Sequence, residues 1–134
     1  MTVRLVRAPD LATAPYAYAA VVDQLVFTAG ACPLDDQGVV VAPGDFERQA
    51  HEVMRNLTVA LEAAGSGLQH VAKSTVYVAS ADRADLGAVW NVVRSYFGDH
   101  DAPSTLLGVA VLGYTDQLVE VEAVAVRSEA ELTS

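Results

Sequence analysis

The sequence contains few basic residues. Eight lysines and arginines stand against seventeen aspartates and glutamates, which gives a formal net charge of −9 at pH 7. The acidic residues are spread along the chain, and such a surface repels a phosphate backbone. We therefore expect no nucleic acid among the partners of this protein.

Cysteine and long apolar runs are also scarce. Cys32 is the only cysteine, so no disulfide can form within the chain. No apolar run reaches the roughly 20 residues that cross a bilayer, and the N-terminus lacks a basic region followed by an apolar run. We expect a cytoplasmic protein with no membrane partner.

The histidines do not form a metal motif. His51 is predicted on the polar side of a helix, and His70 and His100 lie in predicted loops. No pair has the His-x-x-x-His spacing that is typical of a metal site. We expect neither a metal ion nor a cofactor.

Apolar residues, in contrast, are abundant. They make up 52% of the 134 residues, while charged residues make up 19%. A chain of this length can bury one core, so we expect residues 1–134 to fold as a single domain. The apolar content exceeds what a solvated monomer requires, which indicates a buried interface between subunits.

Hydrophobic periodicity predicts six strands and two helices in the order βββαβαββ. The predicted strands span residues 3–6, 18–22, 25–29, 71–78, 104–112 and 118–126. Asp45 and Asp82 are the expected N-caps of the two helices, and Gly65 and Gly98 the glycines that end them. Two helices cannot cover both faces of six strands, so the prediction is an α+β fold with a mixed sheet and both helices on one face.

The strand patterns indicate what covers the other face. Both alternating sets of the strand predicted at 104–112 are apolar, whereas an antiparallel strand facing water alternates with polar residues. The uncovered face is therefore expected to pack against other copies of the chain. In the last strand, Glu120 and Glu122 are expected on that face, opposite the apolar residues that lie under the helices.

Five stretches make the chain resemble the RidA/YjgF family of reactive-intermediate deaminases. They are "APYAYAAVVDQLVFTAGACPLD" (14–35), "QAHEVMRNLTVALEAAGSGLQHVAKSTVYV" (49–78), "VWNVVRSYFGDH" (89–100), "APSTLLGVAVL" (102–112) and "LVEVEAVAV" (118–126). The resemblance implies a chorismate-mutase-like homotrimer, in which the sheets form a central barrel and ligand clefts lie between subunits. In deaminating members it implies an enamine or imine substrate, an arginine that holds the substrate carboxylate and a glutamate that positions water.

By motif position, the resemblance carries over to Tyr16, Gly30, Asn91 and Glu120. Glu120 is the expected catalytic residue, because a partly buried carboxylate can position water as a general base. Its alternative role is an ion pair or hydrogen bond inside the barrel. Asn91 is either a ligand contact or a hydrogen bond that holds the second helix to a loop.

The arginine does not carry over. The family pattern resembles Pro-Ala-Arg-Ser, and the aligned stretch "APST" places Ser104 at the arginine position. The strand that begins there carries two hydroxyls and no cation. The resemblance is thus to a divergent member that lacks the carboxylate-binding arginine, with Ser104, Thr105 and Leu106 as candidate ligand contacts.

Two further residues are candidates for the ligand pocket. Tyr18 stands beside Tyr16 and would make one wall of the cleft more aromatic, although tyrosine is also common at interfaces. Cys32 follows a predicted strand end and could act as a nucleophile, but no histidine lies near it in the sequence. Free cysteines more often behave as small buried apolar residues.

The expected function is water-assisted hydrolysis of an imine, an enamine or a related substrate that carries no carboxylate. One alternative is a biosynthetic family member that catalyses another hydrolysis, a cyclisation or a protonation. A second is a non-catalytic trimer that binds a ligand or a partner protein. Endoribonuclease activity, sometimes attached to names in this family, fits poorly with the net charge of −9.

Overall fold

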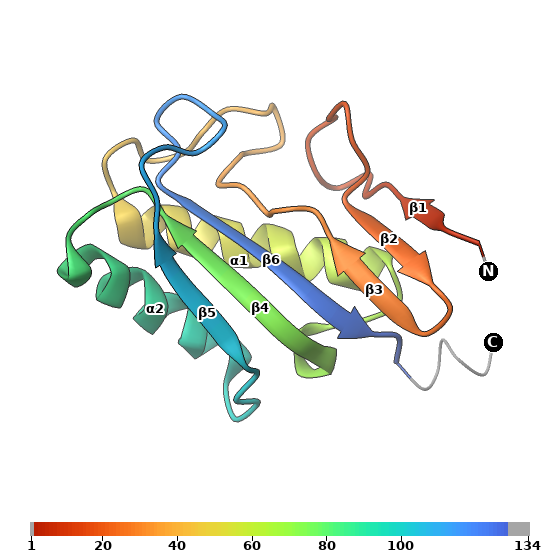
Figure 1. Ribbon diagram of the computed structural model, residues 1–134. Coiled ribbons are helices and arrows are strands. Elements are labelled where there is room, and N and C mark those ends of the chain that lie inside the picture. Colours follow the sequence, from red (N-terminus) through yellow and green to blue (C-terminus); the bar gives the residue numbers. More distant parts are fainter. Residues whose placement is uncertain (1, 129–134) are drawn as a thin grey trace.

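The computed structural model describes residues 2–128 (Figure 1). Its strands are β1 (Arg4–Val6), β2 (Ala19–Val22), β3 (Leu25–Thr28), β4 (Val71–Val78), β5 (Ser104–Gly108) and β6 (Val119–Val126). Its helices are α1 (Phe46–Ala63), the short 3-10 helix η1 (Leu68–His70) and α2 (Arg83–Phe97). The predicted order βββαβαββ is confirmed.

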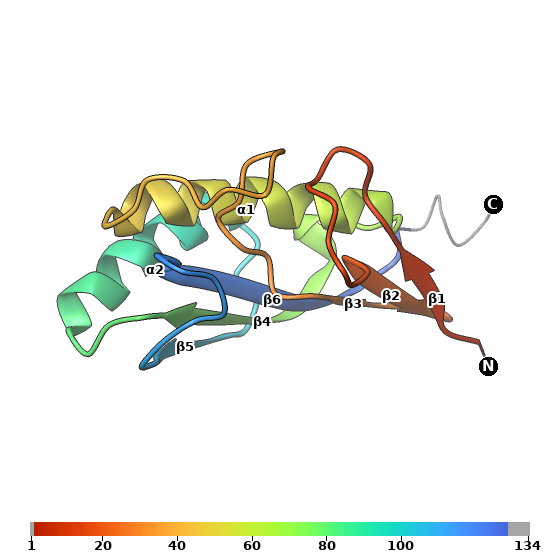
Figure 2. The ribbon, with the colours of Figure 1, turned by 90° about the horizontal axis from the view of Figure 1, so that it is seen from above.

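One six-stranded sheet runs in the order β1-β2-β3-β6-β4-β5. Only β4 and β5 pair in parallel, and all other neighbours are antiparallel, so the predicted mixed sheet is confirmed. Both helices lie on one side of the sheet (Figure 2). Helix α1 packs on β3 and β6, and α2 packs on β4 and β5.

Both helices begin and end where the sequence predicts. The carboxylate of Asp45 accepts a hydrogen bond from the Arg48 N–H at 3.0 Å, and Asp82 does the same for Ala84 at 2.9 Å. Such caps satisfy N–H groups that have no partner within the helix. Gly65 and Gly98 follow the helices with φ values of +80° and +61°, a region that glycine adopts without strain.

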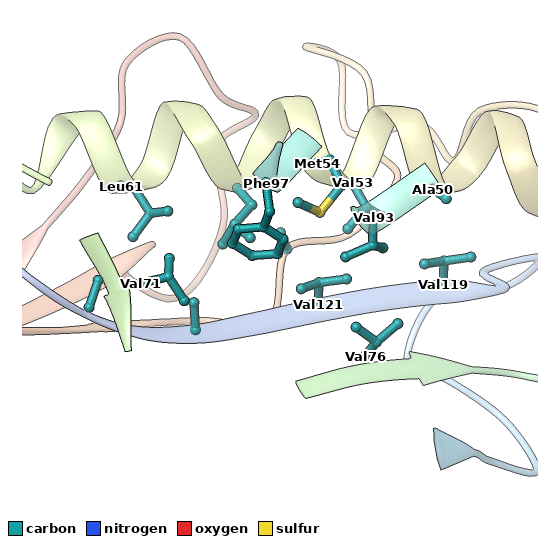
Figure 3. Packing of buried hydrophobic residues seen from close by; sticks show 14 of the residues in the cluster. Ala50, Val53, Met54, Leu61, Val71, Val76, Val93, Phe97, Val119 and Val121 are labelled. Atoms are coloured by element: carbon teal, nitrogen blue, oxygen red, sulfur yellow. The ribbon is translucent and has the colours of Figure 1, made fainter. Parts of the chain in front are cut away.

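The core lies between the helices and the sheet (Figure 3). Met54 and Leu61 of α1 are fully buried against Val119 and Val121 of β6 and their neighbours. Burial alternates along β6, since these valines face the helices while Glu120 and Glu122 are only half-buried on the opposite face. The predicted orientation of the two glutamates is confirmed.

Strand β5 is shorter than the sequence predicts. It ends at Gly108, four residues before the expected end at Leu112. Its partner β4 ends at Val78, which pairs with Gly108, and the chain then turns toward α2. An edge strand cannot continue beyond the strand that supplies its hydrogen bonds, so the apolar run from 109 to 112 leaves the sheet.

Large apolar side chains remain exposed on the face that the helices do not cover. Leu25, Phe27 and Leu107 each keep 42% of their surface exposed. Leu25 and Phe27 come from the inner strand β3 and Leu107 from the edge strand β5, so apolar side chains are exposed on both sides of β6 and β4. Among residues 2–128, no helix combines the length and the hydropathy needed to cross a membrane.

Candidate functional site

Glu120 is the second residue of β6 and lies on the uncovered face of the sheet. Its Oε1 atom accepts a hydrogen bond from Gln117 Nε2 at 2.9 Å and one from Cys32 Sγ at 3.4 Å. Its Oε2 atom accepts no hydrogen bond from residues 2–128. The carboxylate is thus held through one oxygen, while the other is free to accept a proton.

Gly30 lies directly against this free oxygen. The following residue, Ala31, exchanges two backbone hydrogen bonds with Val121 of β6, at 2.7 and 3.2 Å. A Cβ atom at Gly30 would lie 2.0 Å from Glu120 Oε2, far inside van der Waals contact. The absence of a side chain at Gly30 is therefore what allows the carboxylate its position.

Gln117 connects the carboxylate to the loop that precedes β6. Its side chain is 4% exposed. Its Oε1 accepts the Tyr114 N–H at 3.0 Å, and its Nε2 donates to the Val119 carbonyl at 3.1 Å as well as to Glu120. One buried amide thus fixes the loop and the carboxylate together.

Two tyrosine hydroxyls meet beside the carboxylate. The hydroxyls of Tyr16 and Tyr114 are 3.2 Å apart and share a hydrogen bond. Burial, followed by the hydrogen bond with Tyr114, raises the pKa of Tyr16 well above its usual range. Tyr16 is therefore neutral at physiological pH, and the pair presents hydroxyl groups to a ligand.

Tyr18 lies beside this pair and faces a neighbouring cavity. Its ring packs edge-on against Tyr16, with ring centroids 5.8 Å apart and planes at 68°. Its hydroxyl donates a hydrogen bond to the Ala12 carbonyl, and burial raises its pKa. Tyr18 thus supports the ring of Tyr16, and within residues 2–128 it makes no hydrogen bond with Glu120.

Cys32 acts as a hydrogen-bond donor to Glu120. Burial, followed by the neighbouring Glu120 carboxylate, raises the pKa of the Cys32 thiol to about 12. The thiol is therefore protonated at neutral pH, and a thiol in that state is a poor nucleophile. This geometry favours a positioning role for Cys32 over a nucleophilic one.

These side chains surround an open hollow of about 280 Å³ on the uncovered face. Its lining residues are Tyr16, Ala29, Gly30, Cys32, Gly113, Tyr114 and Glu120. The structure thus brings together four residues that the sequence predicts as site residues, and adds the loop at 113–117.

Among residues 2–128, no group of three histidine, cysteine or acidic residues lies close enough to hold a metal ion.

The remaining candidates lie elsewhere in the chain. Ser104, Thr105 and Leu106 are on β5, which is separated from β6 by β4. In the pairing across these strands, Tyr77 stands between Glu120 and Leu107. Asn91 is exposed on α2, also away from Glu120.

Ser104 is occupied with neighbouring groups. Its hydroxyl shares a hydrogen bond with that of Ser74, which is fully buried, and donates to the Ala102 carbonyl at 3.3 Å. Ser104 therefore faces the helix side of β5. A single hydroxyl with two protein partners cannot bind a carboxylate as the two-pronged guanidinium of an arginine does.

A cation nevertheless lies beside β5, where the sequence indicated none. Lys73 of β4 donates a hydrogen bond from Nζ to the Thr105 hydroxyl. The two strands pair in parallel with Thr75 opposite Thr105, so Lys73 is brought there by the sheet. It lies on the uncovered face, opposite to the direction in which Ser104 points.

Sequence reasoning missed Tyr114, Gln117 and Lys73 as site residues. Tyr114 and Gln117 belong to an irregular loop, whose conformation no periodicity predicts. Lys73 approaches Thr105 only through the parallel pairing of β4 with β5. A predicted register for those strands is the one signal that could have located it.

The model of the protein family described as Endoribonuclease L-PSP matches residues 7–127. The chain is 36% identical over 118 residues to the RutC family protein UK114 of Drosophila melanogaster, covering 88% of this chain and 83% of that protein. It is 33% identical over 116 residues to a 2-iminobutanoate/2-iminopropanoate deaminase of Mus musculus, covering 87% and 84%.

Two solved structures show the same fold. The YjgF gene product of E. coli superposes with a TM-score of 0.80 at 28% identity, covering 93% of this chain and 99% of that one. E. coli TdcF with bound serine superposes with a TM-score of 0.80 at 27% identity, again covering 93% and 99%.

Proposed function

The chain belongs to the RidA/YjgF family, and we propose that it hydrolyses an imine or enamine to a carbonyl compound and ammonia. Support comes from relatives named 2-iminobutanoate/2-iminopropanoate deaminase, which are 30 to 33% identical to this chain. The net charge of −9 supports a small molecule, and not RNA, as the substrate.

The observation that carries this proposal is the asymmetric environment of the Glu120 carboxylate. Gln117 and Cys32 hold Oε1, while Oε2 lies free beside Gly30 and the hollow. A general base needs a fixed carboxylate with one oxygen open to the proton that it accepts. Neither donor to Oε1 carries a positive charge, so the carboxylate is not neutralised by an ion pair.

In the proposed reaction, Glu120 Oε2 accepts a proton from a water molecule as the water oxygen bonds to the carbon of the C=N group. The same carboxylate returns the proton to nitrogen. A further proton transfer from the new hydroxyl to nitrogen accompanies cleavage of the C–N bond. Ammonia leaves and the carbonyl forms, so the reaction consumes one water and needs no cofactor. The Tyr16 and Tyr114 hydroxyls are suited to orient a polar atom of the substrate.

We further propose that the active form is a homotrimer with its ligand clefts between subunits. Glu120 and the β5 residues Ser104 to Leu106 lie apart within one chain, and the uncovered sheet face carries large exposed apolar side chains. A second copy could bring its β5 to the Glu120 hollow and bury that face. Light scattering coupled to size exclusion tests this, and a stable monomer at micromolar concentration would contradict it.

The preferred substrates are expected to carry no carboxylate. Ser104 stands at the position of the family arginine but is bonded to Ser74 on the helix side, and the Lys73 ammonium group is engaged with the Thr105 hydroxyl. A neutral imine, generated in place by an amine oxidase, should therefore be a better substrate than 2-iminopropanoate generated by an amino-acid oxidase.

The decisive test compares Glu120→Gln with Glu122→Gln. Both glutamates face the same side of β6, and Glu122 is bonded to the Tyr77 hydroxyl, so it is a matched control for loss of a charge. Ammonia release should fall about 100- to 10,000-fold in Glu120→Gln, because a positioned base typically contributes that much. Turnover within a few-fold of wild type in Glu120→Gln would remove Glu120 from the mechanism.

A non-catalytic ligand-binding trimer is the second candidate. It is favoured by the serine at the arginine position and by the related TdcF structure, which contains bound serine. This hypothesis predicts saturable binding of a small molecule at the Glu120 hollow, with no ammonia release above the uncatalysed rate.

A further inference from the structure

A second cavity adjoins the Glu120 hollow from the helix side of the sheet. Its volume is about 170 Å³. Its walls come from the loop between β1 and β2, from the segment at 29–36 and from α1. Figure 2 shows both connecting segments rising on the α1 side of the sheet. Tyr16, Ala29 and Cys32 border both spaces, so the strand-like segment at 29–32 separates them.

The inner walls of this cavity are apolar and aromatic. Leu34 and Ala60 are buried beside it, and the Tyr16 and Tyr18 rings stand edge to face along one side. Both tyrosine hydroxyls are already engaged, by Tyr114 and by the Ala12 carbonyl. The tyrosines therefore offer ring surface to a ligand, and aromatic ring faces attract cations.

The amide of Asn56 presents only its acceptor to the cavity. Its Nδ2 group donates to the carbonyls of Cys32 and Leu34, each at 2.9 Å. Both amide hydrogens are used in this way, which fixes the segment at 32–34 to α1. The Oδ1 atom accepts no hydrogen bond from residues 2–128, so it is available to a donor.

The rim of the cavity carries four carboxylates from three separate segments. Asp35 is engaged by two backbone N–H groups of its own turn, and Glu52 by Arg55 at 2.5 Å. Asp10 and Asp36 make no hydrogen bond or ion pair within residues 2–128. No lysine or arginine lines the cavity.

Every side-chain polar group left free at this cavity is therefore a hydrogen-bond acceptor. An enclosed, aromatic-walled space with that lining favours a ligand that supplies donors and a positive charge. We propose that the cavity binds a small protonated amine, with the ammonium group toward Asn56 and the rim carboxylates and a short apolar body against Leu34 and Ala60.

This site is distinct from the proposed hydrolytic site. Its lining includes Glu52, Asn56 and Ala60 of α1 on the helix side, whereas Glu120 and the proposed subunit interface lie on the uncovered face of the sheet. Assembly through that face leaves the cavity accessible. Glu120→Gln should thus bind the amine as wild type does, so failure of one proposal is distinguishable from failure of the other.

The test is a titration of the full-length ¹⁵N-labelled protein with isobutylammonium, followed by amide NMR signals. Isobutanol and isobutyrate have the same apolar body with a neutral and a negative head. Isobutylammonium should shift the signals of Leu34, Asn56 and Ala60 in a saturable way, and the other two should not. Equal shifts with isobutanol would overturn the proposal, because the acceptors would then not distinguish a protonated amine from a neutral alcohol.

Two double variants test the role of the rim at equal net charge. Asp10→Asn/Asp36→Asn removes the unpartnered carboxylates, while Glu47→Gln/Glu62→Gln removes two exposed carboxylates of α1 that do not line the cavity. The first should raise the dissociation constant about 2- to 30-fold and the second should leave it unchanged at physiological ionic strength. Equal effects would show that only the overall negative charge attracts the amine.

A third variant fills the space itself. Ala60→Leu adds three carbons at a wall of the cavity and should abolish the shifts at Leu34 while the remaining spectrum stays dispersed. Undiminished binding in a folded Ala60→Leu protein would place the amine elsewhere. If that variant does not fold, the comparison of the two double variants still decides the proposal.

Discussion

Replacing Gly30 by alanine places a methyl group where the carboxylate of Glu120 lies. The new Cβ would be 2.0 Å from Oε2 and 2.8 Å from Cγ of Glu120, whereas ordinary contacts begin at 3.4 Å. The free oxygen must therefore move by 1.4 Å, the difference between 3.4 and 2.0 Å. Rotation of the Glu120 side chain achieves this without moving either strand, because its carboxylate is only half-buried.

The displacement should remove the chemistry and spare the fold. A misplacement of about 1 Å in a reacting group can cost on the order of 100-fold in rate, and full loss of a general base about 100- to 10,000-fold. The same movement breaks the 2.9 Å hydrogen bond from Gln117, whose buried amide keeps its bond to the Val119 carbonyl but is left with one N–H without an acceptor. An unsatisfied buried donor lowers the free energy of unfolding by about 1–3 kcal/mol.

The assay is ammonia release from an imine that an oxidase generates in place, together with denaturant unfolding of each variant. Gly67→Ala is the matched control, since no atom lies within 4 Å of its Cβ position and its φ of −175° suits any residue. Gly30→Ala/Glu120→Gln should be no less active than Glu120→Gln alone, because both changes disable one group. Wild-type turnover in a folded Gly30→Ala protein would refute the assignment of Glu120 Oε2 as the base.

Three further outcomes are expected. Gln117→Leu should lower kcat by about 10- to 100-fold with little change in KM, since its amide positions the base and a misplaced base costs rate; a rise in KM alone, measured by steady-state kinetics, would contradict this. Thr105→Arg should improve kcat/KM for 2-iminopropanoate by about 10- to 100-fold, because Thr105 lies on the uncovered face while Ser104 faces the helices, and a guanidinium binds a carboxylate through charged hydrogen bonds; an unchanged value would show that this position of β5 does not set specificity. Because the pKa of Cys32 is raised to about 12, its alkylation should stay slow at pH 8 and accelerate only toward pH 12. Glu120→Gln should speed that alkylation at a given pH, since it removes the carboxylate that disfavours the thiolate, and an equal rate would contradict the assigned cause.

The elements of the fold were predictable because their signals are local. Asp45 and Asp82 each cap a helix through a side chain that bonds its own first turn. The 71–78 strand was predicted with its observed bounds from β-branched residues alone. The end of β5 was not predictable in this way, because it depends on where β4 leaves the sheet.

The candidate site was predictable only in part, for a related reason. Tyr16, Gly30 and Glu120 were nominated by resemblance, and the structure places them around one hollow. The sequence does not predict Gln117 as a site residue, because its role depends on three hydrogen bonds that it makes from within an irregular loop. The sequence does not predict Lys73 either, because Lys73 reaches Thr105 only through the parallel register of β4 and β5, and no short stretch of sequence determines that register.

The separation of Glu120 from β5 also allows a direct test of whether the cleft is shared between subunits. Thr105 is exposed at the edge strand, so Thr105→Trp should block the proposed cleft from one side without disturbing the core. Glu120→Gln disables the other side. Each variant alone should be inactive in the ammonia assay.

The two variants can be unfolded together and refolded as a mixture. If the cleft is shared between subunits, Glu120 and Thr105 of each cleft then come from two different copies of the chain. In randomly mixed trimers, about one quarter of the clefts combine an intact Glu120 with an intact Thr105, so about one quarter of wild-type activity should return. A site contained within one chain would regain nothing, because every chain in the mixture carries one defect. Recovery near zero from a mixture that forms trimers would therefore refute the shared cleft, while leaving the role of Glu120 to the single-variant comparison.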